Sequence, residues 1–313
     1  MENKVPLLSL CIPTNGRAEW VVPLLESIYS QGEDPALFEV VITDNAANPD
    51  LASAVSAMTH PNLKYFPTES AGFTNQVDAF EKCSGLFCKM LNHRSVMLPG
   101  SIRMLLSLVE RYSTEKPLIY CTNGVLKTKE EDIDCADLDT FVKRLGIYAS
   151  WSAGTALWRE DLQDIRNKPI NSTFPHSVFL FDVHEQGPYL IWDGHYHELQ
   201  NDATSGGYNP FEAFGITFLD LMSRLLKEGR IQPDTFEKVR KDVFLFLRTL
   251  HFKEVVLPAK HGYILTDIPE KMSVYYGRRD YRKMVLYNYS VAPFELGANK
   301  VRKIFASLKR KVK

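Results

Sequence analysis

The segments LLSLCIPTNGR (residues 7–17) and FEVVITDNA (residues 38–46) decide the fold. Each begins as a short, continuous apolar run and ends at polar, turn-forming residues. That pattern is typical of a strand that is buried on both faces and followed by a loop. Residues 20–29 lie between the two segments and carry apolar side chains at helical spacing. The order strand, helix, strand predicts a parallel pair of strands with a helix packed against it.

The same alternation continues to about residue 125. Further strands are predicted at residues 63–66, 86–91 and 118–125, and further helices at residues 51–58, 73–80 and 101–112. Short connections between alternating strands and helices predict an α/β fold with a mostly parallel sheet that helices cover on both faces. Ligands of such sheets bind at the carboxyl ends of the strands. We therefore expect a site at the polar residues 13–17, 44–45 and 92–95, which directly follow three of the strands.

The second half of the chain is less regular. Residues 151–158 and 189–199 are strand-like, residues 177–183 look helical, and residues 211–226 and 233–252 predict two helices. A soft boundary near residues 200–210 separates the sheet from the helical part. We predict a sheet-bearing domain at residues 1–205 and a helical region at residues 206–313.

Composition narrows the class of protein. Of 313 residues, 45% are hydrophobic and 24% are charged, as in an ordinary globular protein. The formal net charge is -1, so no global field favours nucleic acid as a partner. The five cysteines are odd in number and include no Cys-x-x-Cys pair, which argues against a disulfide framework or a zinc site. Because the chain shows no apolar stretch of about 20 residues and no charged-then-apolar leader, we expect a cytoplasmic protein.

Four stretches, two of them from the segments quoted above, make the N-terminal half recognisable. LSLCIPTNGR, EVVITDNA, YFPTESAGFTNQVDAFEKCSG and LFCKMLNHRSVMLPGSI, in this order and spacing, resemble the family 2 glycosyltransferases over residues 6–125. WSAGTALWRED and IWDGHYHELQND extend the resemblance toward bacterial enzymes that build capsule, lipopolysaccharide or other surface glycans. The resemblance implies a GT-A-type fold with a helical C-terminal extension. It also implies a hexosyltransferase-like enzyme that uses a nucleotide-sugar donor, most commonly a UDP-sugar, and that inverts the sugar's configuration, as is expected of the family.

The resemblance assigns the donor-binding residues. In the family, the loop after the first strand and the aspartate after the second strand hold the nucleoside. The matching positions here are Pro13, Thr14, Arg17, Asp44 and Asn45. The alternative for Asp44 and Asn45 is that they cap the turn that follows them.

The segment after the third strand offers two more candidates. Asn75 and Gly72 are expected near the nucleotide, and the alternative is that they only begin a helix. The two possibilities stay open at the level of sequence.

The turn after the fourth strand departs from the family pattern. Relatives place an acidic Asp-x-Asp cluster there, which holds Mg²⁺ or Mn²⁺ on the donor diphosphate. This chain has Asn92, His93 and Arg94 instead, and no carboxylate lies between Glu81 and Glu110. Hard divalent cations prefer oxygen anions, whereas a guanidinium fits phosphate oxygens. We expect Arg94 and His93 to neutralise the diphosphate; the alternatives are a metal held by other carboxylates, or a chain that has lost catalysis.

An inverting transfer needs a general base for the acceptor hydroxyl. The family's position for it corresponds to His176, with Asp182 in reserve. The alternative for His176 is a helix-capping or packing histidine. Asp193, His195 and His197 form a weaker candidate for a soft metal site.

The C-terminal tail, residues 300–313, has the sequence KVRKIFASLKRKVK. Seven of these residues are Lys or Arg, and the apolar residues fall on one helical face. Such a helix suits an anionic membrane surface, and the alternative is a helix that packs on the body. We expect a peripheral protein at the inner face of the membrane, with a glycan or lipid-linked glycan as acceptor. The competing class is a catalytically inactive GT-A-fold binding or scaffold protein. No Gly-rich phosphate-loop motif supports a third class, the nucleotidyltransferases.

Overall fold

The computed structural model describes residues 5–163, 165–184, 187–200, 206–257, 259 and 261–294. The chain divides into two units. The first is Met1–Ala203 with Arg230–Thr235, and the second is Thr204–Gly229 with Phe236–Lys313. The predicted tail at residues 300–313 lies outside the described residues, as do residues 201–205 at the predicted domain boundary.

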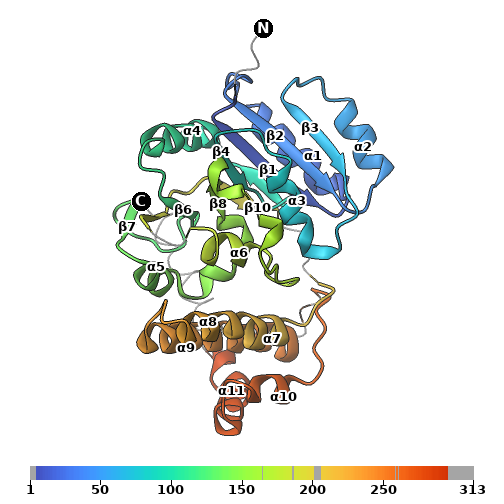
Figure 1. The fold of residues 1–313 in the computed structure, drawn as a ribbon. Helices are drawn as coiled ribbons and strands as arrows, with labels where there is room; N and C mark the ends of the chain where they lie inside the picture. The colour runs from blue at the N-terminus through green and yellow to red at the C-terminus, as the bar shows by residue number, and fades with distance from the viewer. Residues whose placement is uncertain are drawn as a thin grey trace, which may run out of the picture. The chain divides into compact units, whose positions relative to one another are not determined.

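The first unit is built on a five-stranded sheet (Figure 1). Its strands are β1 Leu8–Thr14, β2 Phe38–Asp44, β3 Leu63–Pro67, β4 Phe87–Met90 and β8 Ala156–Trp158. They lie in the order β3-β2-β1-β4-β8. The first four are parallel, and β8 runs antiparallel to β4 at the edge. The mostly parallel α/β sheet that the sequence predicts is confirmed.

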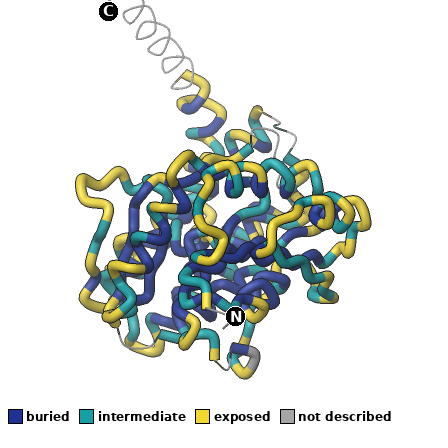
Figure 2. The backbone as a smooth tube through the Cα atoms, turned by 90° about the horizontal axis from the view of Figure 1, so that it is seen from above, coloured by how far each residue is buried: buried dark blue, intermediate teal, exposed yellow. Residues whose placement is uncertain are grey.

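Helices cover both faces of this sheet. They are α1 Ala18–Tyr29, α2 Pro49–Ser56, α3 Asn75–Glu81 and α4 Ser101–Tyr112. Leu8, Leu10 and Ile12 of β1 pack into the same buried cluster as the apolar residues of α1 and α4. The intervening residues of β1 point the other way, where α3 packs against β1 and β2. Each central strand is therefore buried on both sides, which explains its mostly hydrophobic sequence; Figure 2 shows buried positions in dark blue.

Glu39 is a buried charged residue within the sheet. Its side chain is 2% exposed and accepts hydrogen bonds from Ser9 Oγ at 2.5 Å and Ser84 Oγ at 2.7 Å. Lys64 Nζ lies 2.5 Å from Glu39 Oε2. Burial raises the pKa of Glu39, but these donors outweigh it and leave the pKa below its usual value. The carboxylate thus joins β1, β3 and the loop before β4.

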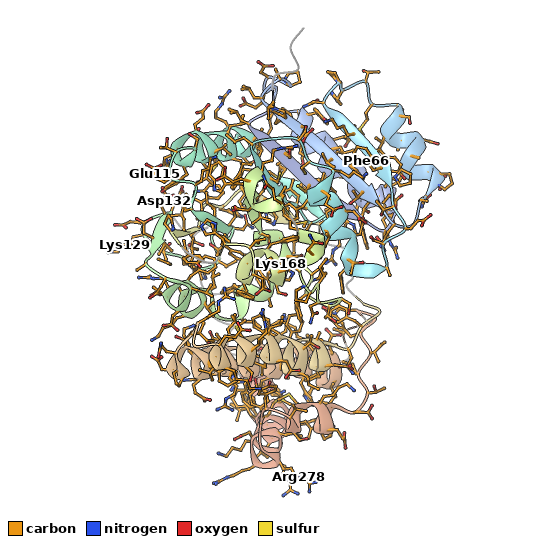
Figure 3. The ribbon with its side chains drawn as sticks, viewed as in Figure 1. Phe66, Glu115, Lys129, Asp132, Lys168 and Arg278 are labelled. Atoms are coloured by element: carbon orange, nitrogen blue, oxygen red, sulfur yellow. The ribbon has the colours of Figure 1, made fainter. Side chains whose placement is uncertain are left out.

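The strand predicted at residues 118–125 exists but belongs to a different sheet. It is shorter, β6 Leu118–Cys121, and pairs with β9 Tyr189–Trp192, which in turn pairs with β7 Asp132–Cys135. Tyr112 Oη donates to Asp132 Oδ2 at 2.8 Å, and Arg111 pairs with the same carboxylate, so α4 is tied to β7. Asp132 is labelled in Figure 3. An apolar run identifies a strand but not its neighbour, because pairing is decided by contacts distant in sequence.

Two other predicted strands are interrupted. Residues Ser152–Gly154 form a short 3-10 helix rather than strand. The ring of Tyr120 occupies the space beside Gly154, where a Cβ would lie 2.1 Å from Tyr120 Cζ. The run 189–199 is split by a loop into β9 and β10 His197–Leu199. The second piece pairs with β5 Ser95–Met97 instead. Packing of Tyr120 accompanies the interruption of the first predicted strand, and a change of pairing partner accompanies that of the second.

The second unit is helical, as predicted. It contains α7 Pro210–Glu212, a π-helical stretch Ala213–Phe218, α8 Leu219–Lys227, most of α9 Pro233–His251, a π-helical stretch Phe252–Val256, α10 Ile268–Ser273 and α11 Arg278–Ser290. The first unit also has α5 Leu138–Leu145 and α6 His176–Phe181. Among the described residues, no helix combines the length and apolar character needed to cross a bilayer.

We predict that Glu39→Gln lowers the free energy of unfolding by about 1–3 kcal/mol, because a buried charge-assisted network loses its charge. Glu160→Gln is the matched control, since Glu160 forms an ion pair with Lys116 but is 56% exposed. The control should cost less than about 1 kcal/mol. Urea titration at neutral pH measures both. Equal effects of the two substitutions would show that the network does not stabilise the sheet.

Candidate functional site

The ends of β1 and β2 lie side by side at the carboxyl edge of the sheet. Pro13 pairs with Thr43, and Thr14 pairs with Asp44. The parallel register therefore brings the predicted residues of both loops to one place. Thr14 is 3% exposed, while Arg17, which follows Gly16 at the start of α1, is exposed.

Asp44 uses both of its carboxylate oxygens inside the protein. Oδ1 accepts the N–H of Ala46 at 2.9 Å, and Oδ2 accepts the N–H of Asn48 at 2.9 Å and the hydroxyl of Tyr65 at 2.7 Å. The residue is 0% exposed. This is the geometry of a carboxylate that caps a turn. A role of Asp44 in binding a nucleoside stays a prediction.

Asn45 and Asn75 tie the neighbouring loops to the same edge. Asn45 Nδ2 donates to the carbonyl oxygens of Ser70 at 3.0 Å and Gly72 at 3.1 Å. Asn75 Nδ2 donates to the carbonyl of Thr14 at 3.0 Å. Gly72 has φ of +54° in the turn before α3, with no atom within 4 Å of the position of a Cβ. The structure thus brings Asn45, Gly72 and Asn75 together with the β1 loop.

The turn after β4 lies beside the β1 loop. The N–H of Leu91 donates to the carbonyl of Cys11 at 2.8 Å, and His93 Nδ1 is 2.9 Å from Thr14 Oγ1. Asn92 Oδ1 accepts the N–H of Arg94 at 3.0 Å and closes the turn. The three residues that replace the acidic cluster therefore meet the predicted nucleoside loop, as their positions after parallel strands predict.

Trp20 connects the two loops through its indole ring. The guanidinium carbon of Arg17 lies 4.8 Å from the centre of the ring, and that of Arg94 lies 5.9 Å from it. The ring of His93 is 5.2 Å from Trp20, centroid to centroid. Two permanent cations from different loops are thus held on one aromatic residue. Sequence reasoning took Trp20 only as the start of a helix; an aromatic residue three positions after Arg17, on the first turn of that helix, was the available signal.

The electrostatics of this turn favour an anion. Burial lowers the pKa of His93 to about 4, and the charges of Arg94 and Arg17 act in the same direction. With this lowered pKa, His93 is neutral at physiological pH, and its part in neutralising a diphosphate stays a prediction. Positive charge at the edge comes from the two arginines, and arginine keeps its charge at any usable pH.

The residues at this edge do not fit a hard divalent cation. Asn92 offers one amide oxygen, which already accepts a hydrogen bond, and Arg94 carries a positive charge beside it. Within the described residues, no group of three His, Cys, Asp or Glu side chains gathers in a way that could hold a metal ion. The candidate set of Asp193, His195 and His197 is not such a group. Asp193 instead accepts hydrogen bonds from Thr122 Oγ1 at 2.5 Å and Thr128 Oγ1 at 3.0 Å.

Of the two candidate general bases, His176 is buried and Asp182 is paired with an arginine. His176 begins α6 and is 2% exposed, and neither ring nitrogen has a hydrogen-bond partner of good geometry. Burial lowers its pKa to about 4, against the opposite effect of the backbone of Ala149 and Ser150. Asp182 follows α6 and pairs with Arg230 at 3.4 Å. The structure places His176 inside the core, and its catalytic role stays a prediction.

Known structures share this fold. S. aureus TarS 1-349 in complex with UDP-GlcNAc matches with a TM-score of 0.59 and 16% identity, over 80% of this chain and 76% of that chain. The same TarS segment in complex with UDP matches with a TM-score of 0.57 and 16% identity, over 91% of this chain and 87% of that chain. No family model and no curated protein sequence matches. The fold is GT-A-like.

We predict that acid destabilises the protein partly through His176. Its folded pKa of about 4 lies below the ordinary 6.5, so the unfolded chain binds more protons between these values and stability falls as pH drops from about 6.5 to 4. Between pH 7 and pH 5 the contribution is about 2 kcal/mol. His176→Leu should reduce the difference between the urea unfolding free energies at the two pH values.

His195→Leu, at an exposed histidine, controls for the loss of a histidine as such. A difference between pH 7 and pH 5 that is unchanged by His176→Leu would contradict the buried placement.

Proposed function

We propose that this protein transfers a sugar from a nucleotide-sugar donor to a glycan. The observation that carries the proposal is the pair of arginines, Arg17 and Arg94, held on Trp20 at the carboxyl edge of a GT-A-like sheet. A nucleoside diphosphate gains negative charge as the glycosidic bond breaks, and preorganised cations stabilise that charge. The likeness to structures that contain UDP-GlcNAc and UDP supports a donor of the UDP-sugar type.

The proposed division of roles rests on the resemblance of the sequence. Pro13, Thr14 and Arg17 are assigned to the nucleoside, with Arg17 adding positive charge beside Trp20, and Arg94 is assigned to the diphosphate. Asp44 and Asn45 hold the loops that present these groups, through hydrogen bonds to the turn at residues 46–48 and to the loop at residues 70–72.

Arg94 carries the charge neutralisation that a metal ion performs where an acidic cluster is present. A guanidinium offers two parallel N–H groups to two phosphate oxygens, which fixes the leaving group as well as neutralising it. Asn92 supports Arg94 by accepting its backbone N–H at 3.0 Å and lies 3.4 Å from its Nε. The neutral His93 adds a hydrogen bond to Thr14 rather than charge.

For the general base we propose His176, with Asp182 in reserve. A histidine with a lowered pKa is unprotonated at neutral pH and so can accept a proton. Its ring is 2% exposed, however, so an acceptor hydroxyl reaches it only if α6 shifts. The transfer is proposed to be inverting on the resemblance alone.

The proposed acceptor is a growing surface glycan or a lipid-linked glycan in a bacterium. The site of action is then the cytoplasmic face of the membrane. The supporting observation is the basic sequence of residues 300–313, which matches the chemistry of an anionic bilayer.

Arg94→Ala tests the catalytic proposal. We expect turnover of UDP-GlcNAc, by transfer or hydrolysis, to fall about 10²-fold or more, because one group that stabilises charge in the transition state is lost. Arg94→Lys should recover only part of it. Activity of the unaltered enzyme should persist in EDTA. Arg103→Ala, an exposed arginine paired with Glu33, is the matched control and should leave turnover unchanged.

Two results would count against this assignment. Complete loss of activity in EDTA with recovery in Mn²⁺, together with a near-normal Arg94→Ala enzyme, would place the charge neutralisation on a metal. Absence of donor turnover in the unaltered protein under all conditions, with retained nucleotide binding, would support the inactive scaffold instead.

Ending the chain before Lys300 tests the membrane partner. The shortened protein should bind less to vesicles made of equal parts phosphatidylcholine and phosphatidylglycerol, because seven cations are removed, each worth about 1 kcal/mol near the surface. Binding of the full chain should also weaken as salt is added. Sedimentation with vesicles measures both. Equal sedimentation of the two forms would exclude a role of the tail.

A further inference from the structure

Helix α11 carries an exposed face of mixed basic and apolar side chains. Arg279, Arg282, Lys283, Leu286 and Tyr289 stand at positions i, i+3, i+4, i+7 and i+10, which share one side of a helix. All five are exposed, and Leu286 and Tyr289 are 68% and 59% exposed. In Figure 2 the last coloured helix before the grey C-terminal trace alternates between buried and exposed positions. We call these five residues the α11 face.

The opposite side of α11 is packed, so the direction of the α11 face is fixed. Met284 and Asn288 are each 1% exposed. Asn288 Nδ2 donates to the carbonyl of Arg248 at 2.8 Å and lies 3.1 Å from His251 Nδ1, both on α9. The guanidinium carbon of Arg248 also lies 4.1 Å from the centre of the Tyr287 ring. These contacts anchor α11 within its own unit and leave the α11 face outward.

The charge on this helix is strongly one-sided. Four of its thirteen residues are Arg or Lys, beginning with Arg278 (Figure 3), and its one acidic residue is Asp280. Asp280 lies off the α11 face and accepts the N–H of Gly277 at 3.3 Å. The α11 face therefore presents three cations around an exposed leucine and tyrosine without a carboxylate among them.

We infer that the α11 face docks on an anionic membrane surface. A bilayer satisfies each component at once: leucine enters the boundary of the acyl chains, tyrosine sits at the headgroup level, and the cations meet anionic headgroups. The α11 face also lies close in sequence to the proposed membrane tail. Phe294, 79% exposed, ends the described chain, and residues 295–313 follow it.

A second copy of the chain fits this face less well. Two α11 faces in contact would bring three cations against three cations, and like charges in direct apposition are unfavourable. A membrane supplies the opposite charge instead. The inference rests on the membrane partner in the proposed function. It adds to the tail a second membrane-binding surface, which lies on a folded helix.

The test changes the apolar part of the α11 face in the full chain. Leu286→Ser with Tyr289→Ser should weaken partition onto vesicles of equal parts phosphatidylcholine and phosphatidylglycerol by about tenfold or more, since two apolar insertions are lost. Val5→Ser with Leu257→Ser is the matched control: these residues are 58% and 48% exposed and lie off the α11 face. The control should bind as the unaltered protein does, and thermal melting should confirm that both variants fold.

Substitutions of the charged residues of the α11 face provide an independent test. Arg282→Gln with Lys283→Gln should weaken binding to the same vesicles by about tenfold or more at low salt, because each cation near the surface contributes about 1 kcal/mol. It should leave binding to pure phosphatidylcholine vesicles unchanged. Unaltered partition of both double variants would overturn the inference. It would also be overturned if the unaltered protein formed a dimer in ultracentrifugation that the variants lost, while their vesicle binding stayed intact.

The result is separable from the catalytic proposal. Binding of UDP, followed by calorimetry without vesicles, should be the same in these variants and in the unaltered protein. Loss of vesicle binding with intact UDP binding supports the membrane surface alone. If the unaltered protein bound vesicles but not UDP, the proposed donor site would be wrong, whereas the membrane role of the α11 face would still be supported.

Discussion

The side-chain amide of Asn75 holds the carboxyl ends of β1 and β2 together. Its Nδ2 donates to the carbonyls of Thr14 at 3.0 Å and Thr43 at 2.8 Å, and its Oδ1 accepts the hydroxyl of Thr68 at 3.0 Å. The residue is 2% exposed, so these bonds form away from water, where an unmade one is costly. The loops after β1, β2 and β3 therefore leave the sheet from a fixed edge, and the candidate donor-binding residues of these loops are placed relative to it.

Among the residues described at that edge, arginine rather than histidine supplies the positive charge. His93, sealed against Thr14 and flanked by Arg94 and Arg17, is kept neutral by burial and by its neighbours. Arg17 and Arg94 stay protonated near one another because the guanidinium charge is delocalised and a guanidinium holds its proton very tightly. The indole of Trp20 gives both guanidinium groups a favourable cation–π contact, at 4.8 Å for Arg17 and 5.9 Å for Arg94. The turn after β4 thus brings to this edge the arginine that we propose for the diphosphate.

The part of the fold that could be predicted is the part in which local pattern and tertiary context agree. The strands β1, β2 and β4 are mostly apolar because both faces are buried. The end residues of β1 and β2, Thr14 and Asp44, meet because parallel strands share an edge. The partners of β6 and β9 could not be predicted, because a short apolar run carries no information on its neighbour. Helix α11 was missed for a related reason: its exposed Leu286 and Tyr289 blur the helical period that marks a buried face.

The candidate site was predictable in position but not in detail. Asp44 was assigned either to the nucleoside or to a turn, and only the structure shows that both carboxylate oxygens are used within the turn and by Tyr65. His176 stands where a base is expected in sequence, yet its ring is buried, because the apolar residues that follow it pull the start of α6 into the core. Burial of this kind depends on packing that sequence spacing does not reveal.

The central claim is that arginine, and not a metal, holds the diphosphate of the donor. The most direct measurement compares the affinities of UDP and uridine by calorimetry in EDTA. The account predicts that UDP binds at least about tenfold more tightly than uridine without any metal, since charge-assisted hydrogen bonds to phosphate contribute about 1.5–3 kcal/mol. The difference should shrink as salt is added. Equal affinities in EDTA, with a preference for UDP that returns only when Mn²⁺ is added, would contradict it.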